Sequence, residues 1–469
     1  MNLFHELETH ASHTALITER SERIGYGDLL GAADELGRKI APRRLVFVLG
    51  RNNFESIAGY LGFARADAAQ TLINYTIHDA LLAKLLERYR PEFIYLPKAR
   101  AASVKGAQIG ALGDYVLLKT RHDREDALPK GLALLLTTSG STGSPKLVRL
   151  SHENIASNAV AIGQSLGITG ASRPMTTMPM SYSYGLSIIN SHLAVGAAIV
   201  LSEATLMEKR FWDTMRTHGV TTLGGVPFIY EMLKKLRFER MELPHLEYIT
   251  QAGGKLNPVL TAEFAAICAR KGLRFYVMYG QTEATARISC LPWEHVQTKA
   301  GSIGVAIPGG ELWLEDESGS RIDAPGTSGE LIYKGRNVSL GYAESRRDLN
   351  AGDENKGLLR TGDLATRDAE GFFHIVGRKK RFLKVYGNRI SLDEMEQLLR
   401  GAGFDCACAG DDDHLKIYTA GTADAARIRA YVCEHTGVSS SGLAIVSVDA
   451  IPRNESGKVL YAELDAGKA

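Results

Sequence analysis

Short runs of apolar residues alternate with stretches of helical periodicity along much of this chain, and this alternation limits the folds that it can adopt. Residues 45–49 form the run Leu-Val-Phe-Val-Leu, which Gly50 closes, and apolar residues recur at helical spacing in 29–40 and in 54–61. Further strands are expected at 198–201, 246–250 and 275–278. The pattern is typical of a layered α/β fold, in which ligands collect at the carboxyl ends of strands.

The pattern changes at about Glu311, where short strands and tight turns begin. Strands are expected at 330–333 and at 372–376, which indicates a β-rich subdomain. The chain has 469 residues, and single cores stop growing near roughly 250 to 300 residues, so two or three domains are expected. We place the boundary at Lys380, which divides the chain into a large domain, residues 1–379, and a small α+β domain, residues 380–469.

Charge and composition exclude several classes of protein. The 55 Lys and Arg residues nearly balance the 53 Asp and Glu residues, so no global field attracts nucleic acid or an anionic membrane, and an anion site has to be local. No apolar run reaches the roughly 18 residues that span a bilayer, and residues 1–12 lack the apolar core of a signal peptide. We therefore expect a cytoplasmic protein without a membrane or nucleic acid partner. Five cysteines without zinc-ligand spacing are expected to be reduced thiols.

A loop of hydroxyls and glycines follows the apolar run 134–136 and ends in Lys146. Its residues are Thr138, Ser139, Gly140, Ser141, Thr142 and Gly143. The glycines allow backbone N–H groups to turn inward, the hydroxyls add donors and Lys146 adds a compact positive charge, so the loop suits a polyphosphate. It is not a Walker loop, because Pro145 precedes Lys146 and residues 147–150 have the pattern of a strand. The alternative is a flexible surface turn.

A second motif, Tyr279-Gly280-Gln281-Thr282-Glu283, leaves the strand expected at 275–278. Glu283 is a candidate oxygen ligand for Mg²⁺, Thr282 a candidate donor to an α-phosphate, and Tyr279 offers a flat face to adenine. Taken singly, a carboxylate in this place is more often solvated at the start of a helix.

Two further motifs gain meaning only from their order in the chain. Asp363 follows a Gly and could accept both hydroxyls of a ribose, and Arg378 could bridge to sugar or phosphate. Lys458 lies in a glycine-flanked loop near the carboxyl end, where a lysine is normally only solvated.

Together, in this order and spacing, the four motifs strongly resemble the adenylate-forming superfamily of acyl-CoA synthetases, peptide-synthetase adenylation domains and luciferases, from about Tyr26 to Lys458. The chain looks closest to a stand-alone bacterial-type acyl ligase. The resemblance implies a large domain of two α/β subdomains and a small β-barrel-like subdomain, followed by a small mobile α+β domain. It also implies ATP and Mg²⁺ as cofactors, and coenzyme A or the phosphopantetheine of a carrier protein as acceptor.

The resemblance also implies residue roles. The loop Thr138 to Lys146 would handle the β- and γ-phosphates of ATP, Tyr279 would stack on the adenine, and Thr282 and Glu283 would serve the α-phosphate and Mg²⁺. Gly280 would also belong to the ATP- and AMP-binding residues. Gly253, Gly254 and Lys255 would line the adenine pocket, and Asp363 with Arg378 would bind the ribose. Lys458 would act in catalysis between the carboxylate and the α-phosphate. Lys380 would be the hinge between the domains, and Lys384 and Gly387 would belong to the loop that serves thioester formation.

The implied reaction has two halves. A small carboxylic acid attacks the α-phosphate of ATP to give acyl-AMP and pyrophosphate, and a thiol then attacks the acyl carbon and releases AMP. The acyl pocket is expected at Tyr182, Ser183 and Gly225, although Tyr182 could equally be a core aromatic. Amino-acid-activating members have an Asp at the position of Ser183 to pair with the α-ammonium, so an α-amino acid is disfavoured.

Alternatives remain open at this point. The chain is short for an acyl-CoA synthetase, which keeps open the alternative of a stand-alone ligase that loads an acyl carrier protein. A luciferase-like oxygenase and a nucleotide-binding protein without catalysis are more distant alternatives, and the presence of Lys458, Glu283 and Asp363 argues against the last.

Overall fold

The computed structural model describes residues 3–122, 127–137, 146–379, 381–385, 388–411, 414–421, 425–436, 440–453, 457 and 459–465. The chain groups into two compact units. Unit 1 comprises residues 1–300, 306–311 and 334–359, and unit 2 comprises residues 301–305, 312–333 and 360–469. The predicted division into residues 1–379 and 380–469 stays a prediction.

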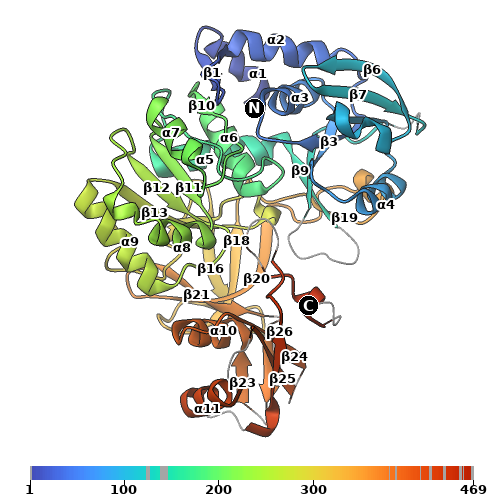
Figure 1. Cartoon of the computed structure of the whole chain (residues 1–469). Helices are drawn as coiled ribbons and strands as arrows, with labels where there is room; N and C mark the ends of the chain where they lie inside the picture. Colours follow the sequence, from blue (N-terminus) through green and yellow to red (C-terminus); the bar gives the residue numbers. More distant parts are fainter. Residues whose placement is uncertain are drawn as a thin grey trace. The chain divides into compact units, whose positions relative to one another are not determined.

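An eight-stranded sheet organises the amino-terminal half of unit 1 (Figure 1). Its strands, in spatial order, are β19 (Gly341–Ala343), β9 (Leu147–Ser151), β8 (Leu132–Thr137), β4 (Ala69–Asn74), β3 (Leu45–Gly50), β5 (Phe93–Pro97), β7 (Tyr115–Thr120) and β6 (Gly106–Leu112). The four central strands run parallel and the outer pairs are antiparallel. The runs predicted at 45–49 and 147–150 are confirmed as β3 and β9.

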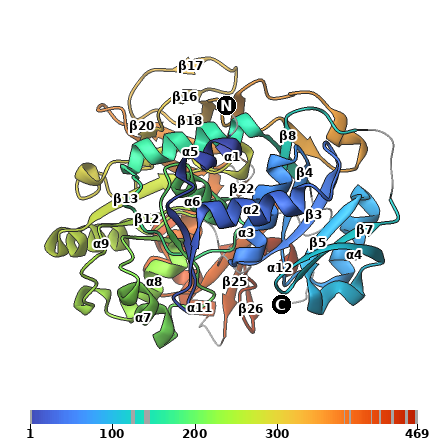
Figure 2. The ribbon, with the colours of Figure 1, turned by 90° about the horizontal axis from the view of Figure 1, so that it is seen from above.

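Side chains of the central strand β3 alternate between two apolar cores, as the two-residue period of a strand requires. Val46 and Val48 face a core that includes α2 (Tyr26–Gly37), α3 (Phe54–Arg65), α5 (His152–Leu166) and α6 (Ser183–Leu193). Leu45, Phe47 and Leu49 face a second core that includes α4 (Asp79–Tyr89). Figure 2 shows α2 and α3 packed side by side. Because both faces are covered, continuous apolar strands are stable here.

A second, five-stranded sheet has the order β11 (Thr222–Gly225), β12 (Tyr248–Gln251), β13 (Arg274–Tyr279), β14 (Ser289–Leu291) and β15 (Val305–Ala306). The first three strands are parallel. The helices α7 (Lys209–Thr217), α8 (Pro227–Lys235) and α9 (Pro258–Lys271) belong to the same region. Strand β12 begins at Tyr248 rather than at the expected Leu246, because the N–H of Leu246 closes a turn on the carbonyl of Leu243.

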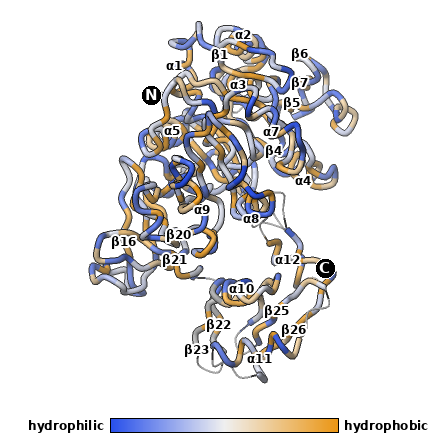
Figure 3. The backbone as a smooth tube through the Cα atoms, turned by 60° about the vertical axis from the view of Figure 1, so that its left-hand side comes forward, coloured by the Kyte–Doolittle hydropathy of each residue, from blue (hydrophilic) through white to orange (hydrophobic). Residues whose placement is uncertain are grey.

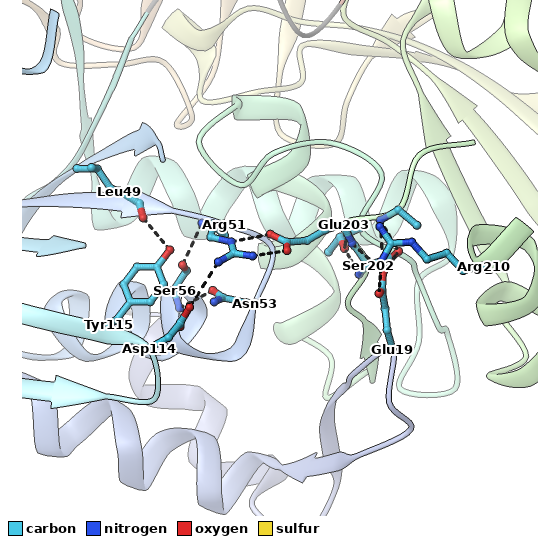
Figure 4. Close-up of polar contacts among 12 residues, drawn as sticks. Glu19, Leu49, Arg51, Asn53, Ser56, Asp114, Tyr115, Ser202, Glu203 and Arg210 are labelled. Carbon is cyan, nitrogen blue, oxygen red and sulfur yellow. Dashed lines mark hydrogen bonds and ion pairs between the residues drawn. The ribbon is translucent and has the colours of Figure 1, made fainter. Parts of the chain in front are cut away.

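The short helix α1 (Leu3–Glu6) precedes β1 (Thr14–Ile17) and β2 (Arg23–Gly25), and these two strands form a small sheet with β10 (Ile199–Val200). Figure 4 shows how ion pairs join this region to the end of β3. Arg51 donates from Nε to Glu203 Oε1 at 2.8 Å and lies 3.5 Å from a carboxylate oxygen of Asp114. Arg210 reaches Glu19 at 3.2 Å, and Glu19 accepts from Ser202. These contacts connect segments of unit 1 that are far apart in sequence.

Unit 2 contains the β-rich region that the sequence predicts. Its five-stranded sheet has the order β17 (Arg321–Ile322), β16 (Glu311–Glu315), β18 (Gly329–Lys334), β20 (Leu358–Arg367) and β21 (Phe373–Arg378). The strands predicted at 330–333 and 372–376 are thus confirmed with slightly longer or shifted bounds.

The carboxyl-terminal part of unit 2 is a small α+β arrangement. It contains the hairpin β22 (Phe382–Val385) and β23 (Asn388–Ser391), the sheet of β24 (Cys406–Asp411), β25 (His414–Ala420) and β26 (Leu443–Val448), and the helices α10 (Leu392–Gly401), α11 (Ala425–Thr436) and α12 (Tyr461–Asp465). Met395, Leu399, Ile417, Ile428 and Val432 meet in one apolar core. Pairing of β24 and β25 with two helices gives this stretch a core of its own.

Hydrophobic and hydrophilic residues alternate at short intervals along the backbone tube of Figure 3. Within the described residues, no helix combines the length and apolar character needed to cross a membrane.

Candidate active site

The turn after β13 carries the motif Tyr279 to Glu283. Gly280 is required there, because a Cβ atom would lie 1.7 Å from the carbonyl oxygen of Ala286. The chain then forms one short 3₁₀ turn, Thr282–Ala284, and Thr285 adopts a left-handed backbone with φ 65°. The missing side chain of Gly280 therefore allows the motif to turn back sharply at the carboxyl end of a parallel strand. This is the edge of the sheet where the sequence predicts ligand binding.

Glu283 and Lys146, which belong to two different predicted motifs, meet at one tyrosine. The hydroxyl of Tyr342 donates to Glu283 Oε1 at 2.7 Å. The Nζ atom of Lys146 lies 5.2 Å from the centroid of the Tyr342 ring and 3.0 Å from Glu344 Oε1. Burial, and then the Glu283 carboxylate, raise the pKa of Tyr342 above its usual value, so the hydroxyl keeps its proton and remains a donor.

Strand pairing explains why these residues meet. Strand β19 pairs antiparallel with β9, with Tyr342 opposite Val148 and Ala343 opposite Leu147, so Tyr342 lies beside the point where Lys146 enters β9. The fully buried Arg149 holds β19 in place by donating from Nε to the Tyr342 carbonyl at 3.0 Å.

Thr282 contacts the expected acyl-pocket residue Ser183. Its hydroxyl donates to Ser183 Oγ at 3.3 Å, at the first residue of α6. The adjacent Tyr182 is largely buried, and burial raises the pKa of its hydroxyl. A Cβ atom on Gly253, whose φ is 82°, would lie 2.5 Å from the Tyr182 hydroxyl. The structure thus brings the predicted acyl and adenine segments into contact within unit 1.

The segment Gly253-Gly254-Lys255 forms the loop after β12. Gln251, which is 1% exposed, donates from Nε2 to the Gly254 carbonyl at 2.7 Å and fixes the turn. The Tyr279 hydroxyl accepts from Gln281 Nε2 at 3.1 Å. At Gly225, which is expected to line the acyl pocket, Ile229 packs closely against the backbone, since a Cβ atom would lie 2.6 Å from its side chain.

In unit 2 the sheet register pairs Asp363 with Arg378. Arg367 faces Phe373 and Ala365 faces Ile375, so a regular ladder would place Gly377 opposite Asp363. A register shift between Leu364 and Ala365 brings Arg378 opposite Asp363 instead, with Nε 3.4 Å from Oδ1. Bulges commonly redirect side chains in this way. Asp363 is 5% exposed, so the pair presents one buried carboxylate and one accessible guanidinium.

Several predicted residues lie outside the described part of the chain: Thr138, Ser139, Gly140, Ser141, Thr142, Gly143, Lys380, Gly387 and Lys458. Lys384 belongs to strand β22, where its backbone pairs with Arg389.

The donor set fits Mg²⁺. A single carboxylate, Glu283, stands beside the hydroxyl of Thr282, and Mg²⁺ is usually held by one or two carboxylates together with substrate phosphates. A cage made only of protein groups is therefore not needed. Lys146, which ends the loop of hydroxyls and glycines, supplies positive charge at the Tyr342 ring.

Sequence reasoning missed Tyr342 and the two asparagines that hold the turn. Asn158 and Asn337 both donate from Nδ2 to the Arg287 carbonyl at 2.9 Å, and Asn337 also donates to the Ala284 carbonyl at 2.9 Å. Both asparagines are buried. Their only sequence signal is a polar residue within an otherwise apolar context, which does not identify a partner.

A cleft of about 540 Å³ opens elsewhere in unit 1, lined by Arg51, Tyr75, His78, Asp79 and Arg100 among others. Both arginines are already neutralised, Arg51 by Glu203 and Arg100 by Asp79. The cleft therefore presents no unpaired arginine to an anion.

Comparison with protein families identifies one match over most of the chain: residues 3–343 match the model of the AMP-binding enzymes. A sulfoacetate–CoA ligase of Cupriavidus necator is 29% identical and aligns with 96% of this chain and 93% of its own length. An oxalate–CoA ligase of Arabidopsis thaliana is 29% identical over 77% of this chain and 74% of its own. A 2-succinylbenzoate–CoA ligase of Bacillus velezensis is 29% identical over 71% and 68%.

Among solved structures, the o-succinylbenzoate CoA synthetase of Bacillus subtilis in complex with ATP and magnesium is similar with a TM-score of 0.80. The two chains are 23% identical, and the similarity covers 99% of each. At this identity the likeness establishes the fold, and the fold class expected from the sequence is confirmed.

Proposed function

This chain belongs to the AMP-binding enzyme family, and on that premise we propose that it activates a small carboxylic acid with ATP and transfers the acyl group to coenzyme A. The superfamily and the enzyme class expected from the sequence, an AMP-forming acid–thiol ligase, are confirmed by the family match and by relatives that are CoA ligases. The first half-reaction gives acyl-AMP and pyrophosphate, and the second gives the thioester and AMP.

The observation that carries the proposal is the meeting of Lys146, Tyr342 and Glu283. A lysine that ends a glycine- and hydroxyl-rich loop and a carboxylate from the Tyr279–Glu283 motif contact the same side chain. A lysine at the ring and a carboxylate at the hydroxyl of the same tyrosine suit a phosphate chain that is bound through lysine at one end and through a metal at the other.

The reaction brings two anions together, so its main requirement is electrostatic. Mg²⁺ held at Glu283 would withdraw charge from the phosphates. Thr282 would donate to the α-phosphate, and Lys458 would lie between the carboxylate and the α-phosphate. Asp363 would accept the ribose hydroxyls while Arg378 binds sugar or phosphate. No side chain has to form a covalent intermediate.

The large domain, residues 1–379, and the small domain, residues 380–469, would divide the two half-reactions between them. We propose Lys380 as the hinge, and Lys384 and Gly387 as the loop that serves thioester formation. A swing of the small domain would remove Lys458 from the acyl-adenylate and admit the thiol.

We propose coenzyme A as the acceptor and the phosphopantetheine of an acyl carrier protein as the alternative. The relative that aligns with 96% of this chain is named a CoA ligase, which favours coenzyme A. We also propose that the reaction takes place in the cytoplasm, where the sequence leads us to expect the protein.

The names of three relatives point to a class of candidate acid substrates. Sulfoacetate, oxalate and 2-succinylbenzoate each carry a second acidic group beside a carboxylate. Small acids with two acidic groups are therefore the first substrates to test.

The test is ATP–pyrophosphate exchange with a panel of small carboxylic acids, followed by comparison of coenzyme A and a phosphopantetheinylated carrier protein as acceptors. Exchange that depends on an added acid, and thioester formation with coenzyme A, are expected. Binding of ATP without exchange for any acid would instead support a nucleotide-binding protein without catalysis.

A further inference from the structure

Arg287 ends the turn that carries Thr282 and Glu283, and it is buried inside unit 1 with 3% of its surface exposed. Its backbone is held at both ends, since its N–H donates to Asn158 Oδ1 and its carbonyl accepts from Asn158 and Asn337. An arginine remains charged in a protein, so burial of this guanidinium requires a partner that compensates the charge.

The described part of the chain offers Arg287 no carboxylate. Its guanidinium carbon lies 3.8 Å from the centroid of the Tyr184 ring, and its Nε has no hydrogen-bond partner. Burial lowers the pKa of Arg287 below its usual value, against the opposing effects of Tyr184, Tyr182 and Cys290. A ring face attracts a cation, but it does not neutralise the charge.

The other buried arginines of the described chain are paired. Arg149 is 0% exposed and donates to Glu354 at 2.9 Å as well as to several carbonyls. Arg346 is 7% exposed and forms a two-point ion pair with Glu92 at 2.6 and 3.0 Å. Both of these buried arginines thus have a carboxylate partner, as buried charges usually do, whereas Arg287 has none among the described residues. Arg287 lies beside the candidate active site.

Tyr184 places the guanidinium next to the expected acyl pocket. It follows Ser183 in the first turn of α6, and Ser183 contacts Thr282. Its hydroxyl hydrogen-bonds to Thr250 at 2.8 Å and would lie 3.2 Å from a Cβ atom on Gly224. The reacting carboxylate is expected near Thr282, which contacts Ser183, and the Arg287 guanidinium lies against the next residue of α6, Tyr184.

We propose that Arg287 is the counter-ion for a second acidic group of the substrate, so that the enzyme activates short acids with a carboxylate or sulfonate besides the carboxylate that is adenylated. This inference rests on the proposed function. Thr282 and Arg287 contact the adjacent residues Ser183 and Tyr184, so few carbon atoms can separate the two acidic groups. A guanidinium fork suits either anion.

The experiment measures kcat/KM in ATP–pyrophosphate exchange for matched pairs of acids: malonate and propionate, succinate and butyrate, sulfoacetate and propionate. The parent enzyme should prefer the acid with two acidic groups in at least one pair by roughly 10- to 100-fold, as expected for a buried hydrogen-bonded charge. The three pairs separate carboxylate from sulfonate recognition.

Arg287→Met should abolish this preference while exchange with the monoacid partner is kept or increased. Arg287→Lys, which keeps the charge but loses the fork, should retain part of the preference. Arg173→Met is the matched control, since Arg173 is a partly buried arginine of unit 1 that donates to a backbone carbonyl, and it should leave the preference unchanged. The melting temperature of Arg287→Met should equal or exceed that of the parent, because an uncompensated buried charge is removed.

A parent enzyme that prefers the monoacids in all three pairs would overturn the inference and leave the proposed function intact. The same holds if Arg287→Met keeps the parental preference, or if it melts well below the parent and Arg287→Lys shows no change in preference. Absence of exchange with every acid would count against the proposed function itself.

Discussion

Tyr342 gives the most direct test of the geometry around Glu283. In Tyr342→Phe the ring that faces Lys146 is kept and only the hydroxyl that donates to Glu283 Oε1 at 2.7 Å is lost. If Glu283 holds Mg²⁺, the Tyr342 hydroxyl orients a metal ligand. Groups that hydrogen-bond to a metal ligand raise the affinity of the site for the metal. We expect the variant to require more Mg²⁺ with little change in the affinity for the carboxylic acid.

The size of the effect follows from the exposure of Tyr342. A hydrogen bond to a charged group contributes about 1.5 to 3 kcal/mol. Tyr342 is 41% exposed, so water replaces part of the contact. We take about 1 kcal/mol as the remaining loss, which corresponds to an increase of about fivefold in the Mg²⁺ concentration at half-saturation.

The assay is Mg²⁺ titration of ATP–pyrophosphate exchange. Tyr26→Phe is the matched control, because it also loses a hydroxyl that is hydrogen-bonded to a carbonyl, in a part of unit 1 without site residues. In a Glu283→Gln background, which itself shifts the titration to higher Mg²⁺, the Tyr342→Phe change should add little, since the two groups act as one unit. Equal titration curves for Tyr342→Phe and the parent would refute the role of this contact.

Three further predictions concern catalysis and stability. Lys458→Ala should abolish acyl-adenylate formation but leave thioester formation from supplied acyl-AMP largely intact; equal loss in both assays would contradict its role. Arg346→Met leaves Glu92 buried without its partner and should lower the free energy of unfolding by about 3 to 5 kcal/mol in denaturant titrations, whereas an unchanged midpoint would show that the pair is dispensable. Burial lowers the pKa of His192 to about 4. Between pH 6.5 and 4 this imidazole therefore binds a proton in the unfolded chain but not in the folded one, and the free energy of unfolding falls by about 3 kcal/mol as the pH drops through that range. His192→Gln should flatten this part of the stability profile, and a profile identical to that of the parent would contradict it.

The sequence predicts the elements whose signal is local. The run at 45–49, the strand after Lys146 and the exit of Tyr279 from a strand all depend on neighbouring residues, and the structure contains them as β3, β9 and β13. The pairing of Asp363 with Arg378 is different, because a regular hairpin would align Asp363 with Gly377. The bulge that shifts the register by one residue has no clear sequence signal. Only the resemblance to a family suggested that Asp363 and Arg378 form a pair.

The residues that sequence reasoning missed owe their positions to long-range pairing. Tyr342 reaches Glu283 and Lys146 because β19 joins the edge of a sheet whose neighbouring strand, β9, is almost two hundred residues earlier in the chain. No periodicity around Tyr342 predicts that pairing, since a three-residue strand is too short to show one.

Arg287 shows most clearly what a sequence leaves out. The chain holds nearly equal numbers of cationic and anionic residues, so its composition would allow every buried arginine a carboxylate. Arg149 and Arg346 pair with carboxylates that are distant in sequence, while the Arg287 guanidinium lies against Tyr184 and its backbone is held by Asn158. An uncompensated buried charge lowers stability, and such costs are usually tolerated where a ligand supplies the missing partner. The unpaired guanidinium is thus evidence for the chemistry of the substrate, and it becomes visible only when each buried charge is traced to its partner in three dimensions.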